Sequence, residues 1–143
     1  MTAGRELDLL LGRERLPRRL QLSFAAEIST TYVHVRWLVW RRDIRSVVAA
    51  LRGDIDECVS PSEPARLGQR LAWPIRRTLD RLPFDSRCLM RSLVLIRMLA
   101  RRGVQGTLVI GVLGDDAFSA HAWVEHGDVP LLPIRGHAPI ARI

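Results

Sequence analysis

The fold is decided by residues 86–126, which begin with SRCLMRSLVLIRMLARRGV (86–104), continue with TLVIGVL (107–113) and end with SAHAWVEH (119–126). The first segment has the 3.6-residue period of a helix, whereas the other two are short runs typical of strands. A turn is expected between the two strands, at Gly114-Asp115-Asp116. This order predicts a helix packed on a small antiparallel sheet, in the α+β class.

The predicted helix is apolar on most of its sides, because Leu89, Leu93, Ile96 and Leu99 form one row and methionine, valine and leucine cover much of the rest. Such a helix is normally central in its domain. Asp85 or Ser86 is expected to cap its start, and Gly103 to end it. After the strands, Gly127-Asp128 predicts a turn into a third strand over residues 130–134.

The half of the chain that precedes Cys88 is predicted to be helical. We expect a long helix over about 17–42, a shorter one over 44–52 between Asp43 and Gly53, a connecting loop over 53–66, and a helix over about 67–82 that is broken or kinked at Pro74. Residues 1–16 are either an arm or a frayed helix. At 143 residues the chain fits one domain, with a helical half (1–82) and a helix-plus-sheet core (83–143).

Composition limits the partners and the compartment. Apolar residues make up 48% of the chain, which indicates a globular protein, and the net charge of +7 comes from scattered arginines without any lysine. An acidic partner is compatible with this charge, but solvated arginines explain it more simply, and nucleic-acid binding is not expected because no motif for it is present. No zinc-ligand spacing or phosphate loop occurs, so we expect no cofactor or metal.

The cysteines and the apolar stretch YVHVRWLVW (32–40) bear on where the protein works. Cys58 and Cys88 without a secretory pattern predict free thiols in the cytoplasm. The stretch raises a membrane hypothesis, but it is about half as long as a span and contains Arg36, so we interpret it as core. Membrane association stays open.

Cys88 and His121 are the candidate catalytic residues. A thiol at a helix start meets partial positive charge that favours the thiolate, and a histidine can act as its general base and acid. Side chains alternate along a strand, so His121 shares a face with Trp123 and Glu125. If this face receives the helix start, the thiol and imidazole can meet. Cys88 can equally be an ordinary buried thiol and His121 a structural histidine; Cys58 is interpreted as incidental.

A combination of motifs resembles one family. The segments CLMRSL (88–93), RRGV (101–104), LVIGV (108–112) and AHAWVE (120–125), in this order, resemble the B2 proteins of lasso-peptide biosynthesis, which are transglutaminase-like cysteine peptidases. The close match covers about residues 83–133. The resemblance implies a transglutaminase/papain-like core, with Cys88 as the nucleophile that forms a thioester and His121 as the base and acid.

The resemblance also implies a substrate and partners. The family removes the leader from a ribosomally made precursor peptide, beside a leader-recognition protein (B1) and an ATP-dependent cyclase that closes the lasso. The family pattern has an orienting aspartate a dozen or more residues after the histidine, but residues 131–137 read LLPIRGH. Asp128 is the nearest downstream acid and the candidate third member, although another group such as a carbonyl could hold the histidine.

Two further functions remain open at this point. The chain could be a catalytically impaired scaffold of the same fold that binds precursor or partner proteins without cutting them. A third, weaker interpretation is an acyltransferase or transglutaminase that uses the same cysteine and histidine.

Overall fold

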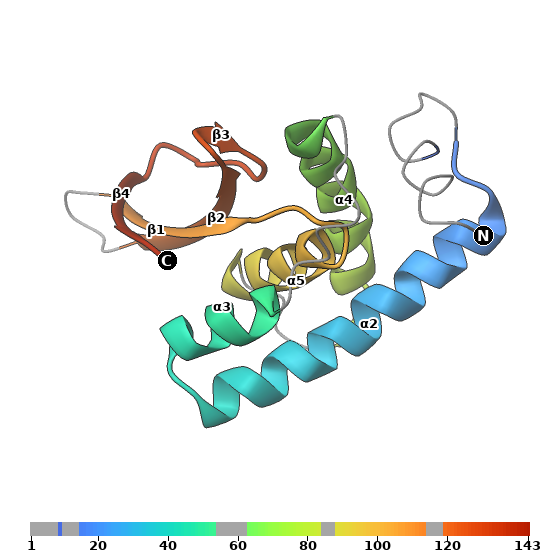
Figure 1. Ribbon diagram of the computed structural model, residues 1–143, viewed down its shortest axis with the longest axis horizontal. Helices are drawn as coiled ribbons and strands as arrows, with labels where there is room; N and C mark the ends of the chain where they lie inside the picture. The colour runs from blue at the N-terminus through green and yellow to red at the C-terminus, as the bar shows by residue number, and fades with distance from the viewer. Residues whose placement is uncertain (1–8, 10–14, 54–62, 84–87, 114–118) are drawn as a thin grey trace.

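The computed structural model describes residues 9, 15–53, 63–83, 88–113 and 119–143. Within these residues four helices precede four strands along the chain. The helices are α2 (Arg18–Arg41), α3 (Ile44–Arg52), α4 (Pro64–Leu79) and α5 (Cys88–Ala100). The strands are β1 (Thr107–Leu113), β2 (Ser119–His126), β3 (Val129–Pro130) and β4 (Ala138–Arg142). Figure 1 shows the helices gathered on one side of the sheet, so the predicted α+β class is confirmed.

The sheet is antiparallel, with the strand order β3-β2-β1-β4. β1 pairs with β2 along its whole length, so that Gly111 lies opposite His121 and Ile110 lies opposite Ala122. β3 covers only the end of β2, at Glu125 and His126. The edge of β2 before that point, where His121 lies, is therefore not covered by another strand within the described residues.

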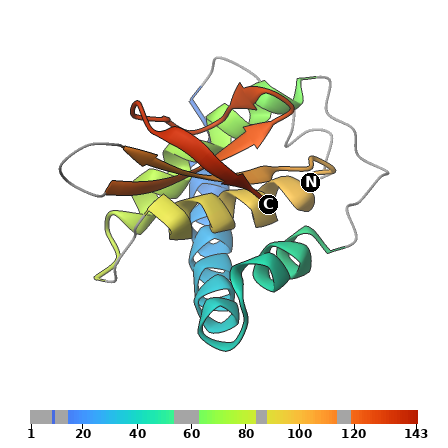
Figure 2. The same ribbon diagram turned by 90° about the vertical axis from the view of Figure 1, so that its left-hand side faces the viewer.

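Helix α5 occupies the centre of the molecule, as its sequence predicts. It contacts α2, α3 and α4 as well as β1 and β2, and Figure 2 shows it directly beneath the sheet with α2 on its other side. Leu93, Leu95, Ile96 and Leu99 are fully buried. Burial of these apolar side chains is the main force that fixes α5, and with it the position of Cys88.

The face of the sheet that receives α5 is not the one that carries His121. Leu108, Ala122 and Val124 belong to the core cluster that contains the α5 side chains. His121 and Trp123 lie on the opposite face because side chains alternate along β2. The condition given above for the thiol and imidazole to meet, that the face of His121 receives the helix, is therefore not met; Cys88 instead approaches β2 from its uncovered edge.

The two helices before residue 53 agree with the prediction. α2 begins immediately after Pro17, and its apolar stripe is buried, including Phe24, Ile28 and Val35. α3 begins after Asp43, whose carboxylate accepts a hydrogen bond of 3.1 Å from the N–H of Ser46. It ends at Gly53, where φ is 47°, a backbone angle that favours glycine.

The next helix and the last strands depart from the prediction. α4 begins at Pro64, three residues before the expected start, because proline suits the first turn of a helix, and it continues through Pro74. The expected strand over 130–134 is reduced to Val129–Pro130. A strand that was not predicted, β4, pairs with β1 on the other edge of the sheet.

One polar cluster joins α2 to the end of α5. Glu27 accepts hydrogen bonds of 2.9 and 3.0 Å from Arg102 and lies 3.4 Å from the guanidinium of Arg101. Burial alone would raise the pKa of Glu27, but the hydrogen bonds and positive charges of the two arginines outweigh it, so the pKa is lowered from its ordinary value of 4.5. The charged carboxylate is thus part of the packing between these helices.

No helix in the described part of the chain is both long and apolar enough to cross a membrane.

Candidate active site

Cys88 is the first described residue of α5, and its side chain reaches the uncovered edge of β2. It is a half-buried free thiol. The backbone N–H of Ala122 donates to its sulfur over 3.4 Å, and the hydroxyl of Ser92 donates to its carbonyl oxygen over 2.8 Å. These contacts hold both the sulfur and the first turn of α5. The predicted cap residues Asp85 and Ser86 lie outside the described residues, as does Cys58.

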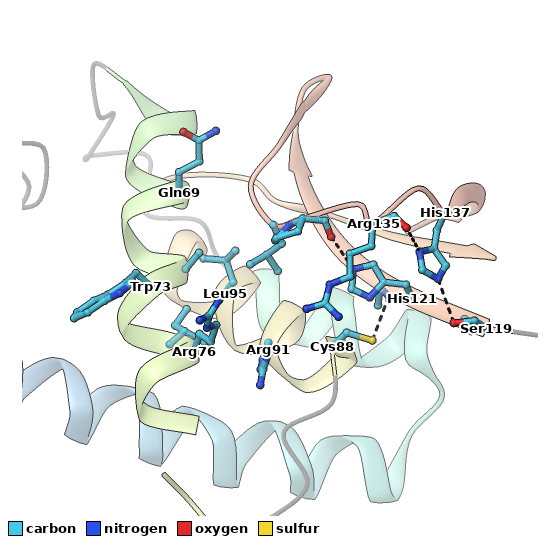
Figure 3. A pocket seen from close by; sticks show the side chains of 16 residues that line it. Gln69, Trp73, Arg76, Cys88, Arg91, Leu95, Ser119, His121, Arg135 and His137 are labelled. Carbon is cyan, nitrogen blue, oxygen red and sulfur yellow. Dashed lines mark hydrogen bonds between the residues drawn. The ribbon is translucent and has the colours of Figure 1, made fainter. Parts of the chain in front are cut away.

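His121 precedes Ala122 on β2, so the imidazole lies beside the thiol, as Figure 3 shows. Its Nε2 atom is 2.7 Å from the carbonyl oxygen of Pro133. A carbonyl oxygen can only accept a hydrogen bond, so Nε2 must carry the proton. Whenever the ring is neutral, Nδ1 is then the nitrogen without a proton, and it can take one from a thiol. The site therefore holds a histidine in the tautomer that a general base needs.

The group that accepts a hydrogen bond from His121, where the family pattern has an aspartate, is a backbone carbonyl. Pro133 lies twelve residues after His121, in the distance range where an orienting aspartate was sought, and supplies its carbonyl oxygen instead of a carboxylate. Asp128 lies in the exposed turn between β2 and β3. The five residue steps from His121 to His126 alone span about 16 Å. Asp128 makes no contact with His121 among the described residues.

Trp123 belongs to the packing of the sheet. It is 1% exposed, and its indole N–H donates to Glu125 over 2.9 Å. Its ring stacks on His121 with the centroids 5.9 Å apart. Gly111, across the strand pair, leaves room for this ring, because a Cβ at that position would lie 2.7 Å from it. Trp123 thus supports one side of the His121 imidazole.

A second histidine, which sequence reasoning missed, lies against the first. The ring of His137 is 5.1 Å from that of His121. Its Nδ1 donates to the carbonyl oxygens of Ile134 and Arg135, each at 3.1 Å, and its Nε2 accepts from the hydroxyl of Ser119 at 3.3 Å. Nothing in the local sequence marks these residues, because only the pairing of β1 with both β2 and β4 brings them together.

The segment after β3 is fixed against α4. The N–H of Leu131 donates to Val124 over 2.8 Å. The side chain of Leu131 packs so close to Gly68 of α4 that a Cβ on Gly68 would overlap it. The carbonyl of Pro133 follows two residues later, so its position depends on this contact. No local sequence motif could predict that Gly68 on α4 helps to position the carbonyl of Pro133.

Cys88 and His121 open into a cavity of about 670 Å³. One wall consists of α4 and α5, including Trp73, Arg76 and Leu95, and the other consists of β2 and the segment that carries Pro133 and Arg135 (Figure 3). This volume lies in the range of ligand-binding sites. No group of three or more potential metal ligands occurs among the described side chains.

A nucleophile, a base and a fixed acceptor behind the base are the parts needed for acyl transfer through a thioester. Residues 29–140 match a family model described as the transglutaminase-like superfamily, which includes cysteine peptidases. The chain has no significant match among curated proteins or among solved structures. The match covers well over half of the sequence and includes both Cys88 and His121. The chain therefore belongs to the transglutaminase-like superfamily.

Proposed function

We propose that this protein is a cysteine peptidase that removes the leader from a ribosomally made lasso precursor peptide before an ATP-dependent cyclase closes the ring. The observation that carries the peptidase chemistry is the bond of 2.7 Å from His121 Nε2 to Pro133, formed beside the sulfur of Cys88. The choice of substrate rests on the resemblance of residues 83–133 to lasso leader peptidases. A separate leader-recognition protein would present the precursor.

In the acylation step, Nδ1 of His121 takes the thiol proton while the sulfur of Cys88 attacks the carbonyl carbon at the junction of leader and core. The negative charge that develops on the carbonyl oxygen requires a donor, and the backbone N–H of Cys88 is suitable because amides at a helix start have no partner within the helix. The C–N bond then breaks, and His121 returns the proton to the leaving amine. The leader remains as a thioester on Cys88.

In the second step His121 takes a proton from water, and the resulting hydroxide attacks the thioester carbon. The C–S bond breaks, the proton held by His121 returns to the sulfur, and the leader leaves as a carboxylic acid that releases its remaining proton to the solvent. The carbonyl of Pro133 keeps the imidazole in one tautomer through both steps. It carries no full negative charge, so it stabilises the imidazolium less than an aspartate would. We therefore expect a slower enzyme rather than an inactive one.

The test is mass spectrometry of a candidate precursor, encoded beside this protein, after incubation with the protein and its leader-recognition partner. The parent and Cys58→Ser should release an intact leader, whereas Cys88→Ala and His121→Ala should lose cleavage. Circular dichroism should show that all four proteins are folded. Equal cleavage by the parent and Cys88→Ala would refute the mechanism.

The same experiment separates the alternatives. Binding of the precursor without cleavage by any variant would indicate a scaffold of the same fold. A cysteine-dependent product whose mass corresponds to an added amine, instead of water, would indicate acyl transfer. Trapping of a leader thioester on Cys88 would support either enzyme and exclude the scaffold.

A further inference from the structure

Arg135 occupies a backbone conformation that arginine rarely adopts. It lies between β3 and β4 with φ of 56°, followed by Gly136 with φ of 72°. A side chain in this left-handed region costs about 1–2 kcal/mol relative to an ordinary conformation. The hydrogen bonds from His137 to Ile134 and Arg135 hold the turn in place. An arginine therefore stands where glycine would be less strained, and strain of this kind is concentrated at functional sites.

The side chain of Arg135 lines the cavity beside His121, and Figure 3 shows it extending from the loop into the space in front of α5. The cavity wall contains two further arginines, Arg76 and Arg91, but no aspartate or glutamate among its described residues.

These arginines differ in how far their charge is already neutralised. Asp80 forms an ion pair with Arg91 and lies 3.9 Å from Arg76. The guanidinium of Arg135 makes no hydrogen bond or ion pair with any residue that the structure describes; only its backbone carbonyl is bonded, to His137. Of the three arginine charges that line the cavity, that of Arg135 is thus the one with no described carboxylate beside it.

We propose that Arg135 is a substrate-binding residue that holds a carboxylate of the peptide next to the bond attacked by Cys88, with Arg76 as a second cation further along the cavity. This inference rests on the proposed peptidase function and adds a substrate class to it. Guanidinium groups bind carboxylates through paired N–H donors, which fixes orientation as well as charge. The carboxylate comes either from an acidic side chain near the junction or from the new C-terminus of the cleaved leader.

The experiment compares the rates at which Cys88 reacts with iodoacetate and iodoacetamide, measured at Cys88 by peptide mass spectrometry. Both reagents form the same S–CH₂ bond and release iodide, but only iodoacetate carries a carboxylate. The ratio of the two rates therefore cancels any change in the reactivity of the thiol. It reports how strongly the site prefers an anion, and it does not require the protein to cleave a peptide.

Arg135→Gly and Arg135→Gln should lower this ratio by about threefold or more, whereas Arg135→Lys should retain most of it. The glycine variant is the safer test, because glycine is favoured at φ of 56° and its folding is not at risk. Arg77→Gln is the matched control: it removes one arginine charge from α4, and Arg77, although it stacks over the wall residue Trp73, does not itself line this cavity. It should leave the ratio unchanged.

Small competitors identify the source of the carboxylate. N-acetylglutamate α-amide carries it on a side chain, N-acetylalanine carries it at the chain end, and N-acetylglutamine amide is the neutral control. Whichever acid slows iodoacetamide labelling of the parent, but not of Arg135→Gly, names the source. An unchanged ratio in both Arg135→Gly and Arg135→Gln, or an equal fall in Arg77→Gln, would overturn the proposal. If the ratio of iodoacetate to iodoacetamide labelling falls in the Arg135 variants as expected but the parent cleaves no peptide, the peptidase function is refuted and the anion site is retained.

Discussion

The two walls of the cavity at Cys88 and His121 are held by different forces. Cys88 stands at the start of α5, whose apolar side chains are buried against three helices and the sheet. His121 is oriented by the segment between β3 and β4, where Pro133 and Arg135 are exposed and a few hydrogen bonds fix the backbone. Changes in the α5 wall should therefore alter the stability of the whole domain, whereas changes in the β3–β4 wall should alter the site with little effect on stability.

Leu95→Ala gives the largest expected effect on stability. Leu95 is fully buried and also lines the cavity, so truncation removes apolar contacts and leaves a void. The free energy of unfolding should fall by about 2–5 kcal/mol, measured by urea denaturation. Leu22→Ala is the matched control, because Leu22 is 72% exposed on α2. Equal losses in the two variants would show that α5 does not carry the core.

Glu27→Gln tests the polar contact that anchors the end of α5. The variant leaves Arg102, whose side chain is 10% exposed, without its charged partner, and should lower the free energy of unfolding by about 1–3 kcal/mol at neutral pH. Glu63→Gln, which removes an exposed pair with Arg66, should cost far less.

The difference in free energy of unfolding between the parent and Glu27→Gln should depend on pH in a defined direction. The pKa of Glu27 is lowered in the folded protein, because the hydrogen bonds and charges of Arg102 and Arg101 outweigh the opposing effect of burial. Its contribution is therefore fully present above its ordinary value of 4.5 and is lost as the pH falls through the lower folded value. The gap between the parent and Glu27→Gln should narrow below pH 4.5. A difference in free energy of unfolding that stays constant as the pH falls below 4.5 would contradict the role of the charged carboxylate.

The difference between the α5 wall and the β3–β4 wall also explains which parts of the site the sequence could predict. The α5 wall follows from local patterns: the apolar rows of residues 89–99 predicted a central helix, and the short runs of residues 107–113 and 119–126, joined by a turn, predicted two paired strands. The placing of Cys88 at the start of the helix and of His121 on the second strand needed only these two elements. What the pattern could not decide was which face of β2 receives the helix, because Ala122 and Trp123 are both buried.

The β3–β4 wall left no such pattern. A strand over 130–134 was expected, but Pro130 and Pro133 have no N–H to donate to a sheet, and β3 ends at Pro130 with one further backbone bond, from Leu131 to Val124. β4 is an edge strand with mostly exposed residues, so its sequence shows neither an apolar run nor an alternating pattern that would predict a strand. The acceptor for His121 is a main-chain oxygen, which no side-chain motif encodes. A search for an aspartate therefore led to Asp128.

Pro133→Ala and Asp128→Asn decide between the two candidates for the third position. The acceptor at Pro133 is the backbone carbonyl, which alanine retains, so cleavage by Pro133→Ala should stay within about threefold of the parent, with a small loss from the freer backbone. Asp128→Asn should have no effect on the cleavage rate measured by mass spectrometry. A tenfold or larger fall in Asp128→Asn alone would restore Asp128 as the orienting group.

Arg135→Gly has the smallest expected effect on stability and is the sharpest test of the contrast. Glycine relieves the left-handed strain of about 1–2 kcal/mol but adds about 0.5–1 kcal/mol of chain entropy to the unfolded state. The thermal midpoint should therefore stay the same or rise slightly. Arg45→Gly, the same change within α3 and at an exposed site, should lower stability by about 1 kcal/mol. A variant that gains stability while losing its preference for an anionic reagent would show that this wall retains an arginine for binding and not for folding. A clear loss of stability in Arg135→Gly would instead assign Arg135 to the packing of the fold.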